Sequence, residues 1–195
     1  MRSLYRLRYI RLSLLLVAGC VALLLSIPAA LQAQEASVKD VVLTNSNEQL
    51  LLYFTVEKAF TPEMEDAVRN GIPATFTFFI ELHRHRTAWP DQEIVSMNFD
   101  HTLSYDNLKE EYRIKLDEKK KEIVTKELVK AKASMVEVNG LPVVALDFLK
   151  PGEEYTLSVK ARLAEKTLPL FFHHLIPFWK LWHFETDWYD VKFRY

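Results

Sequence analysis

Apolar and polar residues alternate at every second position through the middle of the chain. After Ala74, one row of side chains is apolar and the intervening row is mostly polar; the apolar row is Phe76, Phe78, Ile80 and Leu82. A period of two is typical of a β-strand with one buried face. A second such run, Ile94 to Leu103, follows Trp89, Pro90 and Asp91, whose residue types favour a turn. The pattern predicts one long antiparallel hairpin over residues 74–102.

The two arms of this hairpin also indicate a register. Pairing Thr87 with Gln92 brings both apolar rows onto one face, whereas a slip by one residue would bury polar side chains. The pairs expected in this register are Leu82 with Met97, Ile80 with Phe99, and Phe76 with Leu103. It also places His83 and His85 beside Glu81 on the outer face, and His101 on the inner face near Phe78.

Similar alternation predicts further strands on both sides of the hairpin, over residues 37–44, 50–57, 108–116, 123–124, 143–149, 155–163 and 189–195. Two segments carry the pattern of short helices instead. In the first, Thr61 is a suitable N-cap, Pro62 suits the first helical position, and Gly71 is a C-terminal stop. The second helix is expected over residues 126–135, and Asn139-Gly140 after it is interpreted as a turn.

Tyr155 follows a Pro-Gly corner, as in the tyrosine corner of immunoglobulin-like sandwiches, where the phenol bonds the backbone upstream. About eight strands at regular spacing agree with this reading. The fold class we predict is all-β: an immunoglobulin-like antiparallel β-sandwich over residues 37–195 with two short helices. The charged run 117–121, where Glu118 stands beside three lysines, is interpreted as a solvated turn.

The first 33 residues have the pattern of an export segment rather than of a folded element. Four arginines precede an apolar run from Leu12 to Leu31, and Ala33 is our first choice for a cleavage site. A second possibility is an uncleaved membrane anchor, because the run has about the length that spans a bilayer. A third is a lipobox, Val17 to Cys20, with Cys20 acylated; the apolar residues that continue after Cys20 disfavour it.

Net charge and cysteine content exclude several classes of partner and site. The first 33 residues hold four of the 25 basic residues and none of the 26 acidic residues, so the remainder carries a net charge of −5. A nucleic-acid partner is therefore not expected. Cys20 is the only cysteine, so the part after the export segment has no disulfide, thiolate metal site or cysteine nucleophile.

The sequence contains no recognisable catalytic motif, and we expect neither enzymatic activity nor a cofactor. The chain lacks a Gly-x-Ser-x-Gly element, and three glycines after the export segment cannot build a phosphate-binding loop. His83 and His85 form a His-x-His pair on one strand face, but no third ligand is visible, so solvated histidines are preferred to a metal site. The competing reading is a metal-dependent or other hydrolase whose site residues are dispersed along the chain.

Residues 168–182 are the best candidate for a functional surface because they are almost entirely apolar and aromatic. They could form a lid over one end of the sandwich, or an exposed patch for a partner protein, a ligand or the membrane surface. Trp89 at the hairpin tip is a similar candidate. The residues proposed for partner binding are Trp89, Phe171, Phe172, Phe178, Trp179 and Trp182.

Several short motifs occur together in a characteristic order. They are Asn70-Gly71-Ile72-Pro73, Trp89-x-Asp91, Leu103-x-Tyr105-Asp106-x-Leu108 before Tyr112, Leu168-Pro169-Leu170, and Thr186-Asp187-Trp188-Tyr189. Together they resemble a family of exported bacterial proteins known as domain of unknown function 4390, across nearly all the chain after the export segment. The resemblance implies a small domain of the periplasm or cell envelope of a Gram-negative bacterium, with a membrane sensor kinase as a possible partner. It implies no catalytic residue and no cofactor.

Overall fold

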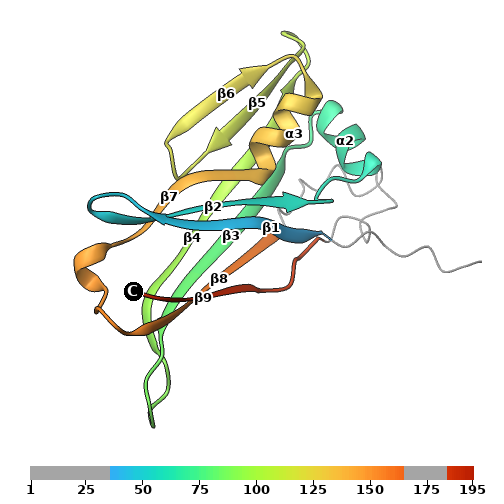
Figure 1. Cartoon of the computed structure of the whole chain (residues 1–195). Helices are drawn as coiled ribbons and strands as arrows, with labels where there is room; N and C mark the ends of the chain where they lie inside the picture. The colour runs from blue at the N-terminus through green and yellow to red at the C-terminus, as the bar shows by residue number, and fades with distance from the viewer. Residues whose placement is uncertain (1–35, 165–183) are drawn as a thin grey trace, which may run out of the picture. The chain divides into compact units, whose positions relative to one another are not determined.

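A computed structural model describes residues 36–164 and 184–195 of the chain. These residues form two antiparallel sheets, two α-helices and a short 3-10 helix (Figure 1). The smaller sheet has the order β1-β2-β7, and the larger has the order β6-β5-β4-β3-β8-β9. The strands are β1 (Ser37–Asn45), β2 (Gln49–Glu57), β3 (Ala74–Arg84), β4 (Gln92–Asp106), β5 (Glu111–Leu116), β6 (Lys121–Thr125), β7 (Glu137–Ala145), β8 (Glu154–Leu163) and β9 (Tyr189–Arg194). The helices are α2 (Pro62–Arg69), α3 (Leu128–Val136) and the 3-10 helix Leu146–Phe148.

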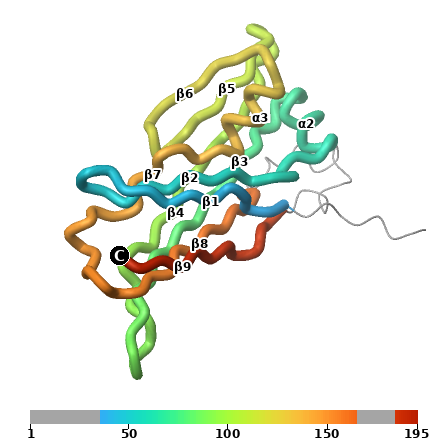
Figure 2. The backbone as a smooth tube through the Cα atoms, viewed as in Figure 1, coloured from blue at the N-terminus to red at the C-terminus, as the bar shows by residue number. Residues whose placement is uncertain are grey.

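The two sheets pack face to face around one hydrophobic core, so the predicted β-sandwich is confirmed. The smaller sheet lies across β3, β4 and β8, as the backbone trace shows (Figure 2). Phe54 of the smaller sheet and Phe78 of the larger one meet edge to face, with ring centroids 5.7 Å apart. The predicted inner row of β3 is fully buried: Phe76, Phe78, Ile80 and Leu82.

Both predicted helices are present and cover the part of the larger sheet's inner face that the smaller sheet leaves open. Helix α2 begins after Thr61, whose hydroxyl accepts a hydrogen bond from the Met64 backbone N–H at 3.3 Å. Helix α3 buries Ala131 and Met135 against β5 and β6. Both segments predicted to be helical are therefore confirmed.

The tyrosine corner predicted at Tyr155 is also confirmed. The Lys150 backbone N–H donates to the Tyr155 hydroxyl at 2.7 Å, and the ring is fully buried. This bond fixes the corner that leads from the 3-10 helix into β8.

The hairpin register differs from the predicted one by two residues. Ile80 pairs with Met97, Phe78 with Phe99, and Ala74 with Leu103. The connection occupies residues 85–91, which is longer than the expected turn, and a bulge follows Leu82. Because side chains repeat every two residues, this shift leaves the same side chains on the inner face. The predicted residue pairs were wrong, whereas the predicted strand faces were right. His101 lies on the inner face as predicted, with its ring centroid 4.7 Å from that of Phe78.

Two turns predicted from residue type alone are corrected. Asn139-Gly140 lies inside β7, where Gly140 takes a φ of +69° at an irregularity in the pairing with β2. The predicted strand 143–149 accordingly belongs to a strand that begins earlier and ends at Ala145. The charged turn after β5 is also not wholly solvated, because the Glu118 side chain is buried against His101.

None of the helices in the described ranges is both long enough and apolar enough to cross a membrane.

Candidate functional site

The loop that joins β3 to β4, residues 85–91, is called the tip loop below. It extends from the end of the β3–β4 hairpin beyond the neighbouring strands (Figures 1 and 2). Trp89 lies in it with 73% of its surface exposed. A tryptophan left in water at the end of a hairpin contributes nothing to the core. The exposure of a tryptophan on a projecting loop therefore makes the tip loop a candidate binding surface.

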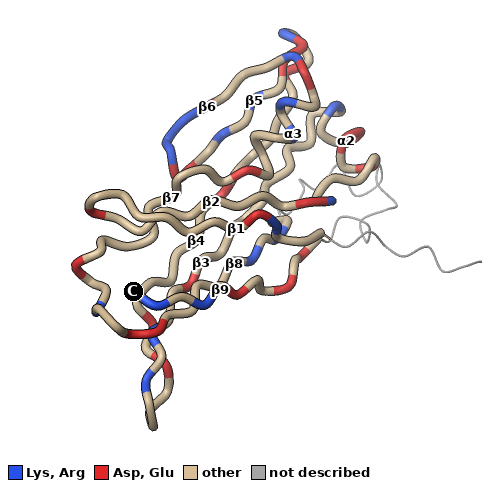
Figure 3. Tube along the Cα trace, in the orientation of Figure 1, with Lys and Arg blue, Asp and Glu red and all other residues tan. Residues whose placement is uncertain are grey.

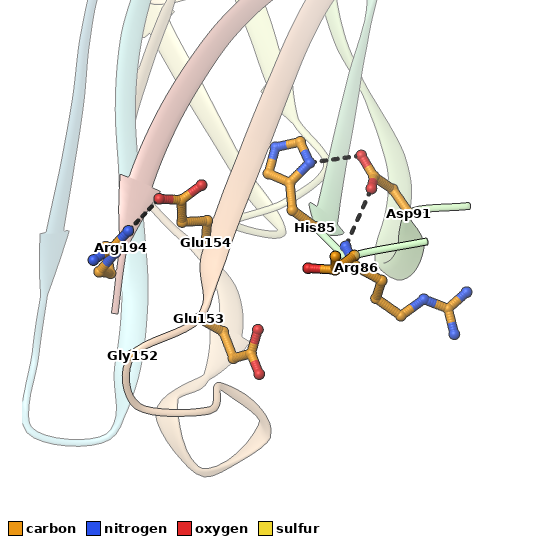
Figure 4. A pocket seen from close by; sticks show the side chains of 8 residues that line it. His85, Arg86, Asp91, Gly152, Glu153, Glu154 and Arg194 are labelled. Atoms are coloured by element: carbon orange, nitrogen blue, oxygen red, sulfur yellow. Dashed lines mark hydrogen bonds and ion pairs between the residues drawn. The ribbon is translucent and has the colours of Figure 1, made fainter. Parts of the chain in front are cut away.

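Side-chain contacts hold the tip loop in one conformation. His85 Nδ1 and Asp91 Oδ2 are 2.8 Å apart across its base, and Arg86 donates its backbone N–H to Asp91 Oδ1 at 3.4 Å (Figure 4). The Arg86 Nε–H donates to the Pro90 carbonyl at 2.9 Å. Ala88 takes a φ of +65°, which reverses the chain just before Trp89. These contacts connect the two ends of the loop on which Trp89 lies.

His85 also reaches the neighbouring strand. Its Nε2 lies 2.7 Å from Thr156 Oγ1 on β8, so hydroxyl, imidazole and carboxylate form a chain of Thr156, His85 and Asp91. The same order of groups activates the nucleophile of serine hydrolases. Sequence spacing gave no sign of this series of contacts, because Thr156 stands 71 residues from His85 and the pairing of β3 with β8 brings them together.

The backbone around Thr156 offers poor support for acyl-transfer chemistry. Thr156 pairs with His83 of β3 on one side and with Lys192 of β9 on the other. In a strand paired on both sides, successive backbone N–H groups are used alternately by the two neighbours. The N–H groups beside the Thr156 hydroxyl are therefore taken by the sheet and are unavailable as an oxyanion hole.

A pocket of about 450 Å³ lies between the tip loop and the start of β8. Its lining is mostly polar and charged: His85, Arg86, Thr87, Asp91, Gly152, Glu153, Glu154 and Arg194 (Figure 4). Arg194 forms an ion pair with Glu154, and this hydrogen bond and positive charge lower the pKa of the Glu154 carboxyl below its ordinary value. Residues of both signs lie close together around the hairpin (Figure 3). The mixed charge suits polar groups of a protein better than a uniformly charged polymer.

The His-x-His pair is not arranged as a metal site. His83 lies on β3, whereas His85 lies beyond the strand end, and both ring nitrogens of His85 are occupied by Thr156 and Asp91. Among residues 36–164 and 184–195, no three side chains of His, Cys, Asp or Glu are grouped as metal ligands.

Of the residues predicted to bind a partner, the structure places Trp89. The remaining five belong to a segment outside the described residues: Phe171, Phe172, Phe178, Trp179 and Trp182. Of the predicted binding surface, the structure therefore describes the tip loop.

Comparison with known proteins gives one match. Residues 33–192 match the model of a protein family described as "Domain of unknown function (DUF4390)". No curated protein matches the chain, and no solved structure matches it.

Proposed function

The chain belongs to the DUF4390 family of domains of unknown function, and from this premise we propose that it is an accessory module of the cell envelope that binds a partner protein through its tip loop. The observation that carries the proposal is the exposure of Trp89 on an ordered, projecting loop. Tryptophan is the residue type most enriched among side chains that dominate binding energy.

The order of the tip loop strengthens the proposal. A loop that is already held in its bound conformation loses little entropy when the partner docks. The contacts of Asp91 with His85 and with the Arg86 backbone supply that order without covering Trp89. Beside the tryptophan, the charged pocket offers hydrogen-bonding groups for the polar rim of an interface.

The proposed location is the periplasm or cell envelope of a Gram-negative bacterium. Four arginines before a long apolar run support export, either with cleavage after Ala33 or with the run retained as an inner-membrane anchor. In that compartment, a periplasmic part of a membrane protein, such as a sensor kinase, is a suitable partner. We further propose that residues 168–182 contribute a second aromatic contact, because their composition is that of a binding surface.

Photo-crosslinking in the native envelope tests the binding proposal. A photoreactive amino acid replaces Thr87, and capture is compared in three backgrounds: otherwise unchanged, Trp89→Ala and Leu108→Ala. Leu108 is a matched control because it is an apolar side chain with 97% of its surface exposed, at the turn between β4 and β5. We expect one envelope protein to be captured in the unchanged and Leu108→Ala backgrounds and to be lost with Trp89→Ala.

A quantitative measurement completes this test. With the captured partner purified, Trp89→Ala should weaken binding by about 2 kcal/mol or more, as expected for a buried aromatic anchor. A Phe178→Ala, Trp179→Ala variant measures the contribution of the aromatic segment separately. Equal capture by Trp89→Ala and the unchanged chain would refute the role of the tip loop.

The chain of Thr156, His85 and Asp91 favours a second candidate function, a hydrolase. We rank it below the binding module because the sheet uses the backbone N–H groups around Thr156. A panel of activated esters separates the two. Turnover that is lost in Thr156→Val and in His85→Ala would favour the hydrolase, whereas equal background hydrolysis in all three proteins would favour the binding module.

A further inference from the structure

Strand β9 forms one end of the larger sheet, and no strand within the described ranges pairs with its outer side. An edge strand presents unpaired backbone N–H and C=O groups in a row, and a second strand can add to them. Its side chains are exposed or half-buried, and Tyr189 and Tyr195 lie with about two fifths of their surfaces in water. The sequence of this edge indicates what it can bind.

The backbone decides which residues of β9 face outward. The Tyr195 carbonyl accepts a hydrogen bond from Gly152, and the Tyr195 N–H donates to the Glu153 carbonyl, so the backbone of Tyr195 faces β8. The direction of the backbone N–H and C=O groups alternates from residue to residue along a strand. The backbone groups of Val191 and Phe193 therefore also face β8, whereas those of Asp190 and Lys192 face outward. Only residues of this second set can exchange hydrogen bonds with a strand added at the edge.

This alternation limits a second copy of β9 to a few antiparallel registers. Centring the pair on Asp190 or on Lys192 would set two like charges directly opposite each other, which is destabilising. Centring it on Val191 sets Asp190 of each copy opposite Lys192 of the other. Both charge pairs are then favourable, and both fall on residues whose backbone groups face outward.

The register centred on Val191 matches the remaining side chains as well. It sets Tyr189 opposite Phe193 on the inner face, and Trp188 opposite Arg194 on the outer face. Aromatic pairs are favourable across strands, whereas within one copy Arg194 already pairs with Glu154 and Lys160 already lies over the Trp188 ring. Asp190 is already held on the outer face by a hydrogen bond from Ser158 at 2.7 Å. The edge from Trp188 to Arg194 is thus complementary to itself.

We propose that two copies of the chain associate through β9 in this register, so that their larger sheets join into one continuous antiparallel sheet. The contact is the same on both copies and closes on itself as a twofold dimer. It leaves the tip loop outside the added strand pair, although Arg194 of this edge also lines the pocket beside the tip loop. The edge is short, and we therefore expect a weak dimer that local concentration in the envelope favours.

Single cysteines test the register in cells, using the full chain with Cys20→Ser as background. In the proposed register Val191 faces its own copy in a non-hydrogen-bonded pair, where opposite residues come close enough for a disulfide. We expect Val191→Cys to give a disulfide-linked dimer under mild oxidation. Asp190→Cys and Lys192→Cys are matched controls, because each would crosslink only if the pair were centred on that residue. Val124→Cys on β6, at the other end of the sheet, controls for random collision.

Charge reversal provides a second test in solution. Lys192→Asp turns both favourable pairs into repulsive ones and should weaken dimerisation roughly tenfold, measured by sedimentation of the Cys20→Ser chain. Adding Asp190→Lys restores opposite charges between the two β9 strands and should recover the dimer. A second substitution would not recover association if Lys192→Asp had only disturbed folding. Failure of Val191→Cys to crosslink above Val124→Cys, or failure of the double reversal to recover association, would overturn the proposal.

Discussion

His101 and Glu118 form a buried pair that joins three elements of the fold. His101 Nε2 lies 3.0 Å from Glu118 Oε2, and the two side chains are 0% and 5% exposed. The other ring nitrogen of His101, Nδ1, donates to the Met135 carbonyl at 3.0 Å, at the end of α3. Because the Met135 carbonyl can only accept, Nδ1 carries a hydrogen of its own, and a second hydrogen bridges Nε2 and the Glu118 carboxylate oxygen. The contact ties β4, the turn after β5 and α3 together.

Removal of one member of this pair should destabilise the fold strongly. We expect Glu118→Ala to lower the free energy of unfolding by about 3–5 kcal/mol, because it leaves the His101 ring buried without its carboxylate. Urea unfolding followed by circular dichroism measures the change. Glu122→Ala is the control, since Glu122 is a half-exposed carboxylate on β6, paired with Arg113 at 3.7 Å, and should cost no more than about 1 kcal/mol. Equal losses in both variants would contradict the role of the pair.

The pair also predicts a dependence of stability on pH. Burial raises the pKa of the Glu118 carboxyl, but the hydrogen bond and charge of His101 outweigh burial, so this pKa lies below its ordinary value of 4.5. The folded state therefore favours the ionised carboxylate, and this stabilisation is complete above the ordinary value and is lost as pH falls through the folded pKa.

Unfolding measurements between about pH 6 and pH 3 check this sign. We expect the free energy of unfolding to fall more steeply with decreasing pH in the unchanged protein than in Glu118→Gln, whose side-chain amide remains neutral throughout. Parallel curves for the two proteins would show that other carboxylates account for the acid sensitivity.

Gly140 offers a test of the bulge inside β7. It combines a φ of +69° with a close approach, since an added Cβ would lie 3.3 Å from the Tyr53 hydroxyl oxygen. Gly152 has a φ of +84° with no heavy atom within 4 Å of an added Cβ. Gly152→Ala should therefore cost about 1 kcal/mol from backbone strain alone, and Gly140→Ala should cost more because Tyr53 must also move. Thermal unfolding of the two variants side by side measures the difference.

The sequence predicted the faces of the strands well because alternation is a local property. It could not give the hairpin register, because a shift of two residues keeps every side chain on the same face. The observed register goes with a connection over residues 85–91 and a bulge after Leu82, and the alternation of side chains indicates neither. Asn139-Gly140 resembled a turn because the same residue types serve a bulge inside a strand.

Side-chain contacts between residues far apart in the chain, in the core and at the candidate site, were harder to predict. Glu118 resembled the solvated charges around it, and its partner His101 comes from another strand. Thr156 had no feature that distinguished it from other outward threonines until β8 was placed beside β3. Trp89 could be selected in advance, since a tryptophan between two strand arms has no obvious place in the core.

The order of the tip loop should depend on Asp91. Asp91 and His85 are 42% and 37% exposed, so their contact contributes little to global stability, and Asp91→Ala should change the free energy of unfolding by no more than about 1 kcal/mol. The same substitution removes both bonds that Asp91 makes across the base of the loop. We therefore expect faster amide hydrogen exchange in residues 86–91 with little change in the strands.

A control and a second variant separate this local effect from a general loss of charge. Lys115→Ala breaks another exposed ion pair, with Asp117 at 2.8 Å near the end of β5, and should leave exchange in the tip loop unchanged. Thr156→Val removes the hydroxyl that contacts His85 Nε2 but keeps the contact with Asp91, so its effect should be intermediate. If Asp91→Ala leaves exchange in residues 86–91 at the level of the unchanged protein, the loop is ordered by its backbone alone. The entropic advantage argued for Trp89 would then not depend on these side chains.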